Sequence, residues 1–218
     1  MSDFIPTVPW PALSRNLVAI LRGITPAEAK AIGQALVDAG FEAIEVPLNS
    51  PDPLASIECL IKTLPPHILV GAGTVLTVAQ AEAVAKVGGR LMVSPNIDEQ
   101  VVRTAGRLGM VTMPGVFTPT EAFAALRSGA SALKFFPAST LGTGGIAAMK
   151  AVLPRDARLG AVGGVAEGDF AAYAKVGVTI FGLGSSLYQP SMTADDVALL
   201  ARGAVAAYDR VFGKEVMP

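Results

Sequence analysis

The stretch "TPAEAKAIGQALVDAGFEAIEVPL", residues 25–48, contains a helix pattern followed directly by a strand pattern. Thr25 is a preferred N-cap residue, Pro26 fits the first helical position, and Glu28 stands at the capping-box offset. Gly40 is typical of a helix end, and the continuous apolar run after it is typical of a strand that is covered on both faces. This stretch therefore predicts one helix–strand unit of an α/β fold.

The same unit repeats along the chain. Apolar strand patterns occupy residues 17–23, 41–48, 68–75, 90–96, 109–115, 131–137, 157–164 and 178–186. Amphipathic helix patterns separate them, in units of about 20–27 residues without a linker. The repeat predicts a single (β/α)8 TIM barrel over residues 1–218. An open doubly wound sheet is the alternative, but no GxGxxG motif follows the first strand.

The opening segment "PWPALSRN", residues 9–16, is predicted to form a short N-terminal helix that covers the bottom of the barrel. Residues 1–16 lack the charged start and the long apolar stretch of a signal peptide. No apolar run approaches the roughly 18–20 residues needed to cross a membrane. We therefore expect a cytoplasmic protein without a membrane partner.

Composition excludes several classes of function. Hydrophobic residues make up 51% of the chain and charged residues only 16%, so a large core is expected and disorder is not. The net charge is −1 and no basic run occurs, which argues against a nucleic-acid partner. Cys59 and His67 are the only cysteine and histidine, too few for zinc or for a Cys-His device. His67 precedes a strand and is expected to be a plain surface residue, and no metal is expected.

The active site of a TIM barrel lies at the C-terminal ends of its strands. Polar residues and glycines stand at those predicted ends: Arg22, Glu45, Thr74, Asn96, Lys134, Gly163, Gly164, Gly184, Ser185 and Ser186. The loops "AVGGV" and "GLGSS" follow the seventh and eighth predicted strands, where barrels commonly bind phosphate with backbone N–H groups. A cation, a carboxylate, a second cation and two phosphate loops are thus predicted at one mouth.

Lys134 lies in the apolar stretch "SALKFFP", where desolvation should lower the pKa of its amine. A neutral amine can attack a ketone and form a Schiff base, and Glu45 is suited to act as general acid and base. The alternative is a structural Lys134–Glu45 ion pair, which would be a poor stabiliser inside a barrel. Arg22 is expected either to bind a substrate carboxylate or to cap the barrel mouth.

The motifs "AILRGITPAEA", "EAIEVPLNSP", "GAGTVLT", "VSPN", "GVFTPTEA", "ALKFFPA", "AVGGV" and "GLGSSLY" together resemble the bacterial 2-keto-3-deoxy-6-phosphogluconate / 6-phosphogalactonate aldolase family. The resemblance runs from about residue 17 to beyond residue 188. It implies that Lys134 is the Schiff-base lysine and that Glu45 is the general acid and base. It also implies a substrate-binding set of Thr74, Pro95, Phe136, Gly163, Gly164, Gly184 and Ser185. It further implies a cytoplasmic homotrimer without metal or cofactor that acts on a phosphorylated keto-deoxy sugar acid.

Two departures distinguish branches of that family. Asn49 stands where the phosphogluconate enzymes usually have arginine, and Val162 stands where they usually have threonine. Both departures resemble the 6-phosphogalactonate branch, and an apolar wall in place of a hydroxyl partner would alter recognition of the C4 epimer. With Asn49 in that place, Arg22 becomes the stronger candidate for binding the carboxylate.

The expected reaction is the reversible cleavage of 2-dehydro-3-deoxy-6-phosphogalactonate to pyruvate and glyceraldehyde 3-phosphate. The alternative within the family is a 2-dehydro-3-deoxy-6-phosphogluconate or 4-hydroxy-2-oxoglutarate aldolase. An alternative of a different class is a phosphosugar isomerase or sensor barrel without Schiff-base chemistry. That class would need a Glu–His pair or paired aspartates at the mouth, and the sequence places neither there.

Overall fold

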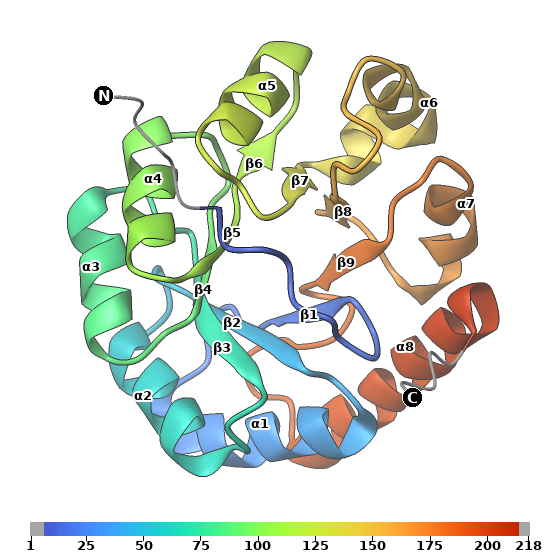
Figure 1. Ribbon diagram of the computed structural model, residues 1–218. Helices are drawn as coiled ribbons and strands as arrows, with labels where there is room; N and C mark the ends of the chain where they lie inside the picture. The colour runs from blue at the N-terminus through green and yellow to red at the C-terminus, as the bar shows by residue number, and fades with distance from the viewer. Residues whose placement is uncertain (1–6, 214–218) are drawn as a thin grey trace.

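Parallel strands form the inner wall of the protein, and helices surround them (Figure 1), in a computed structural model that describes residues 7–213. The strands are β1 (Leu17–Ile20), β2 (Ala43–Pro47), β3 (Leu69–Gly73), β4 (Leu91–Val93), β5 (Val111–Met113), β6 (Gly115–Val116), β7 (Leu133–Phe135), β8 (Leu159–Val162) and β9 (Ile180–Leu183). They pair in the order β5-β4-β3-β2-β1-β9-β8-β7-β6, and every pairing is parallel. The predicted TIM barrel is confirmed.

The helices follow the strands in alternation, as the repeat predicts. They are α1 (Pro26–Ala39), α2 (Pro53–Thr63), α3 (Val78–Lys86), α4 (Glu99–Arg107), α5 (Pro119–Arg127), α6 (Ala138–Lys150), the 3-10 helix η1 (Glu167–Asp169), α7 (Phe170–Lys175) and α8 (Ala194–Phe212). Helix α1 begins with the predicted capping box of Thr25 and Glu28, and it ends at Gly40 with a φ of 104°. The local signals at this helix were sufficient to place both of its ends.

The fifth predicted strand, residues 109–115, forms two short strands instead of one. Pro114 separates β5 from β6, and β5 pairs with β4 while β6 pairs with β7. Proline has no backbone N–H to donate, but its carbonyl still accepts a hydrogen bond of 3.0 Å from the Lys134 backbone N–H. Because β5 and β6 are the two ends of the sheet order and are consecutive in the chain, the sheet closes on itself.

The predicted N-terminal helix is wrong, since residues 7–16 contain no helix. Pro9 and Pro11 flank Trp10, and each removes a backbone donor and restricts its neighbour, which opposes a regular helical turn. The segment still covers the bottom of the barrel. Trp10 and Leu13 are buried in the hydrophobic cluster of the barrel interior, and Figure 1 shows the segment crossing the end of the barrel that faces the viewer.

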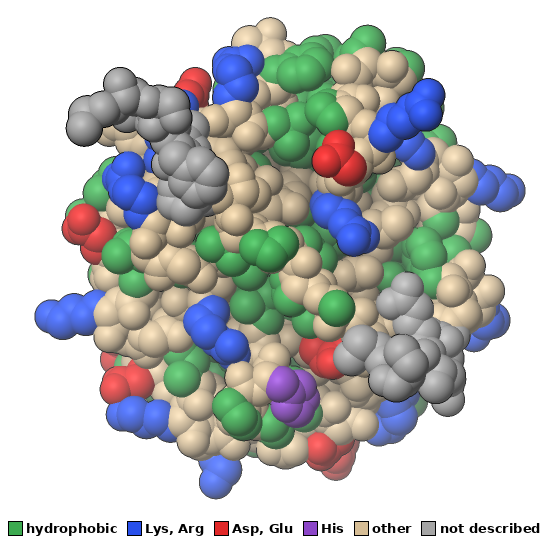
Figure 2. Space-filling model, viewed as in Figure 1, with side chains coloured by type: hydrophobic (Ala, Val, Ile, Leu, Met, Phe, Trp, Pro, Cys, Tyr) green, Lys and Arg blue, Asp and Glu red, His purple; other side chains and the backbone are tan. Residues whose placement is uncertain are grey.

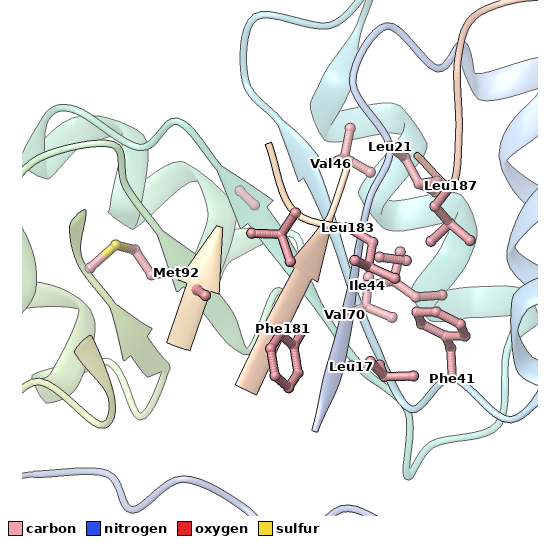
Figure 3. Packing of buried hydrophobic residues seen from close by; sticks show 14 of the residues in the cluster. Leu17, Leu21, Phe41, Ile44, Val46, Val70, Met92, Phe181, Leu183 and Leu187 are labelled. Atoms are coloured by element: carbon pink, nitrogen blue, oxygen red, sulfur yellow. The ribbon is translucent and has the colours of Figure 1, made fainter. Parts of the chain in front are cut away.

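Strand alternation divides the buried side chains into two layers. Ile44 and Val46 of β2 belong to the layer between strands and helices, and Figure 3 shows this outer packing around Phe41 and Ile44. Ala43 belongs to the cluster inside the barrel, so Glu45 also faces inward, because successive residues of a strand point to opposite faces. Lys134 of β7 faces inward for the same reason, between the outward-facing Leu133 and Phe135.

On the face shown in Figure 2, Lys and Arg side chains are interspersed with Asp and Glu, without a continuous basic surface. None of the helices in the described residues combines the length and the apolar character that crossing a membrane requires.

The packing of the N-terminal segment predicts a large stability difference between two identical substitutions. Leu13 is 7% exposed inside the barrel bottom, whereas Leu199 on α8 is 66% exposed. We expect Leu13→Ala to lower the free energy of unfolding by about 2–5 kcal/mol, because a cavity remains in the barrel interior. Leu199→Ala should change it by only about 0.5 kcal/mol. Denaturant unfolding measures both, and equal losses would contradict the role of the segment as a barrel plug.

Candidate active site

A cavity of about 590 Å³ opens at the C-terminal ends of the strands. Its wall combines side chains from β1, β2, β7, β8 and β9 with the loops that follow them. The lining residues are Ile20, Arg22, Glu45, Lys134, Phe136, Val162, Gly163, Gly164, Val165, Ala166, Gly182, Gly184, Ser185 and Ser186. Every residue predicted at the site lines this cavity except Asn49, Thr74, Pro95 and Asn96.

Lys134 presents its amine to this cavity. The side chain is buried, and its Nζ atom lies 4.6 Å from the centre of the Phe136 ring. No hydrogen bond or ion pair to the amine is found within residues 7–213. Burial lowers the pKa of the Lys134 amine from 10.5 to about 8, although the Glu45 carboxylate opposes this shift and the Arg22 guanidinium adds to it. At pH 7 a pKa of about 8 leaves about a tenth of the amines neutral, roughly 300 times the fraction at the ordinary value.

Glu45 on β2 is also buried in the wall of the cavity, and its Oε2 atom has no hydrogen-bond partner among the described residues. Burial raises the pKa of the Glu45 carboxyl group to about 7, against the charges of Lys134 and Arg22, which lower it. In the described part of the chain, no ion pair within 4.0 Å joins Glu45 to Lys134. The two groups therefore share one cavity without forming the structural ion pair considered from the sequence.

The side chains of Arg22 and Asn49 are joined by a hydrogen bond. Asn49 Oδ1 accepts a hydrogen bond of 2.5 Å from Arg22 Nη1. Asn49 does not line the cavity itself, but it contacts Arg22, which does. A second bond ties the same two loops, because the Gly23 backbone N–H donates to Ser50 Oγ at 2.9 Å. Loops that follow β1 and β2 are thus joined at the cavity mouth, with the guanidinium held at its edge.

Thr74 and Pro95 lie outside the cavity lining. Thr74 directly follows β3 and has a φ of 55°, a left-handed conformation that is unusual for threonine. The Pro95 carbonyl packs against Gly115, where an added Cβ would lie 2.2 Å from the carbonyl oxygen. Both residues are at C-terminal strand ends, as predicted, but neither side chain is among those that surround the cavity.

The two glycine loops follow β8 and β9, and β9 pairs with β1, the strand that precedes Arg22. Gly163 and Gly164 have φ values of 91° and 69°, which side chains rarely tolerate. At Gly184, an added Cβ would meet no atom within 4 Å. Ser186 Oγ donates a hydrogen bond of 3.1 Å to the Val165 carbonyl and so ties the two loops together. Backbone N–H groups of such loops can receive an anion.

The sequence interpretation missed four lining residues, Ile20, Val165, Ala166 and Gly182. Ile20 and Gly182 stand two residues before Arg22 and Gly184, so strict period-2 alternation along β1 and β9 could have identified them. Val165 and Ala166 belong to the loop after β8, and their place depends on how that loop folds back. His67 is exposed and precedes β3, which confirms it as a surface residue.

Comparison with known proteins agrees with these features. A family model described as "Aldolase: KDPG and KHG aldolase" matches residues 13–202. A probable 2-dehydro-3-deoxy-6-phosphogalactonate aldolase of Rhizobium meliloti (strain 1021) is 60% identical over 206 residues, covering 94% of this chain and 97% of the relative. A 2-dehydro-3-deoxy-6-phosphogalactonate aldolase of Escherichia coli (strain K12) is 47% identical over 192 residues, covering 88% and 94%. A solved structure described as native KDPGal superimposes with a TM-score of 0.90 at 45% identity, covering 93% of this chain and 98% of that one.

The charges around Lys134 predict opposite effects for two substitutions. Glu45→Gln should lower the pKa of Lys134 further, because it removes a negative charge that favours the ammonium form. Arg22→Met should raise it, because it removes a like charge. The rate of modification by a small amine-reactive reagent, followed by mass spectrometry over pH, measures the pKa, with exposed Lys30 as internal control. Shifts of the same sign in both variants would contradict this account.

Proposed function

Because this chain belongs to the KDPG and KHG aldolase family, we propose that it is a class I aldolase for 2-dehydro-3-deoxy-6-phosphogalactonate. It cleaves this sugar acid reversibly to pyruvate and glyceraldehyde 3-phosphate. Two relatives that match nearly the whole chain carry that name. The observation that supports the chemistry most directly is the Lys134 amine, which is buried, unpaired within the described residues, and directed into the cavity.

In the first step, the neutral Lys134 amine attacks the C2 ketone of the substrate. The resulting carbinolamine loses its hydroxyl group as water and becomes a protonated Schiff base. Proton transfers to and from oxygen accompany both changes. Glu45 is suited to them, because a pKa of about 7 leaves its acid and its base forms both populated near neutral pH.

In the second step, the Glu45 carboxylate removes the proton of the C4 hydroxyl group, directly or through a water molecule. The C3–C4 bond breaks, its electron pair moves to C3 and into the iminium, and glyceraldehyde 3-phosphate leaves with the C4 aldehyde. The enamine that remains on Lys134 takes a proton at C3. Hydrolysis of the imine then releases pyruvate and restores the amine.

Two parts of the cavity wall are assigned to substrate binding. We assign the substrate carboxylate to Arg22, which Asn49 holds, because a guanidinium can bind a carboxylate through two parallel hydrogen bonds. We assign the phosphate to the loops of Gly163, Gly164, Gly184 and Ser185, whose backbone is open to the cavity. Phe136 lies beside the amine, where it excludes water from the imine.

Val162 is the proposed determinant of the epimer. It is buried at the end of β8 and contributes an apolar side chain to the cavity wall. The phosphogalactonate and phosphogluconate substrates differ only in the configuration at C4, so a single wall residue near that carbon can separate them. By resemblance to the family, we further propose a cytoplasmic homotrimer of one barrel domain that uses neither metal nor cofactor, and Thr74 and Pro95 as neighbours of the pyruvate portion.

Reductive trapping tests the Schiff base. Incubation of the wild-type protein with pyruvate and borohydride should attach a reduced pyruvyl group to Lys134, because the reagent converts the imine into a stable secondary amine. Peptide mass spectrometry locates the adduct. Lys134→Met should remain folded and unlabelled, with cleavage activity lost. A folded wild-type protein that acquires no pyruvate-dependent adduct at Lys134 would disprove the proposed mechanism.

Steady-state kinetics on the two pure C4 epimers tests the role of Val162. We expect Val162→Thr to move the ratio of kcat/KM towards the phosphogluconate epimer by about tenfold or more, because a hydroxyl partner replaces an apolar wall. Val165→Thr is the matched control, since the same substitution is made in the same cavity, on the loop assigned to the phosphate. Its ratio should stay unchanged. An unaltered ratio in Val162→Thr would remove this residue from the account of specificity.

A further inference from the structure

We propose that Gly73 is a positioning residue for Glu45: the bare inward face of β3 at this residue forms a recess that seats the Glu45 carboxyl group apart from the Lys134 amine. The inference deepens the proposed function and rests on it. Gly73 is not among the residues that line the cavity, and no polar atom of its own takes part in the chemistry.

The volume that a side chain at Gly73 would need is already occupied by Glu45. A Cβ added at Gly73 would lie 1.6 Å from Glu45 Oε2, 2.3 Å from Cδ and 2.5 Å from Oε1. All three distances are far below van der Waals contact. Glycine at this position is therefore required by the place of the carboxyl group.

Backbone conformation does not account for this glycine. Gly73 is absent from the residues of positive φ, unlike Gly163 and Gly164, so an alanine could adopt its conformation. Gly71, two residues earlier on the same strand, is a different case. An added Cβ there would lie 2.0 Å from the Leu91 backbone oxygen, which cannot move without disturbing β4. Of these two glycines of β3, Gly73 is the one whose added Cβ would meet the end of a side chain instead of backbone.

The wall behind the carboxyl group is fixed. Gly73 pairs with Pro47 in the parallel β2–β3 ladder, and its carbonyl accepts a hydrogen bond of 2.8 Å from the Leu48 backbone N–H. The next residue, Thr74, is held in a left-handed conformation, and strained backbone of this kind is concentrated at functional sites. The backbone that forms this wall of the recess is therefore rigid.

The carboxyl group is positioned by shape, since its Oε2 atom has no hydrogen-bond partner within residues 7–213. A side chain at residue 73 would push it out of the recess towards the open side, which is the cavity that Lys134 also faces. A carboxylate that approaches the ammonium group favours the charged amine. Loss of the recess would thus misplace the acid–base group and also reduce the neutral fraction of Lys134.

The test compares Gly73→Ala with wild type in two assays. Exchange of the C3 hydrogens of pyruvate with deuterium from solvent, followed by NMR, reports proton transfer on the Lys134-bound enamine. Modification of Lys134 by an amine reagent over pH, without pyruvate, reports the state of the amine. We expect exchange to fall about tenfold or more and the midpoint of modification to move to higher pH. Gly203→Ala, on exposed α8 with open space around the Cβ, should change neither.

A shortened carboxyl side chain provides the rescue. Glu45→Asp withdraws the group by one methylene, so Gly73→Ala should cost less exchange activity in the Glu45→Asp background than in wild type. If Gly73→Ala alone does not fold, recovery of folding in the double variant supports the recess. Any one of three results would overturn the inference. The first is wild-type exchange together with an unmoved midpoint in Gly73→Ala. The second is strictly additive losses of exchange activity from the two substitutions, and the third is a double variant that also fails to fold. Absence of exchange and trapping in wild type would instead refute the proposed function, while the reagent midpoint would still decide on Gly73.

Discussion

Desolvation of two ionisable groups inside the barrel is the constraint on which the rest of the structure depends. Lys134 and Glu45 are both buried, and burial disfavours the charged form of each, so their pKa values approach one another near neutral pH. In water the same two side chains would be almost fully charged at pH 7. A reactive amine and a carboxyl group able to exchange protons thus exist together because the surrounding wall is apolar and because the two are not paired.

Such a pair does not stabilise a fold, so stability must come from elsewhere in the molecule. The outer layer between strands and helices is a continuous hydrophobic core, to which Leu133 and Phe135 contribute on either side of Lys134. The lower half of the interior is also apolar and is closed by Trp10 and Leu13. The polar groups are confined to the upper half of the interior, where glycines on the inner faces of β3, β8 and β9 leave room beside them.

Local sequence signals predicted much of this arrangement. Thr25 and Gly40 marked the ends of α1, and the apolar runs placed the strands, because both signals depend on neighbours in the chain. The helix predicted over residues 9–16 failed because two prolines outweigh the apolar spacing there. The hydrophobicity of residues 109–115 predicted one continuous strand, but Pro114 divides the segment into two.

The candidate site was predictable where a residue lies on a strand and less so where it lies in a loop. The positions of Lys134 and Glu45 follow from strand alternation. The contact of Arg22 with Asn49 depends on how two loops fold over the rim, which no period in the sequence encodes. The recess at Gly73 is also a property of packing, because it is defined by a side chain that is 28 residues away in sequence.

The hydrogen bonds between the loops after β1 and β2 hold Arg22 on segments that are separate from the strands of Lys134 and Glu45. Mutations can therefore alter these two sets of residues independently. Arg22 is held by a side chain of the neighbouring loop, and Gly23 is held by Ser50, so the proposed anchor for the substrate carboxylate rests on segments outside the sheet. Lys134 and Glu45 rest on strands whose positions the barrel determines. Under the proposed function, mutations in residues 49–52 would change which acid is bound while Lys134 and Glu45 stay in place. A barrel of this kind can acquire a new substrate through its rim and retain an old reaction in its interior.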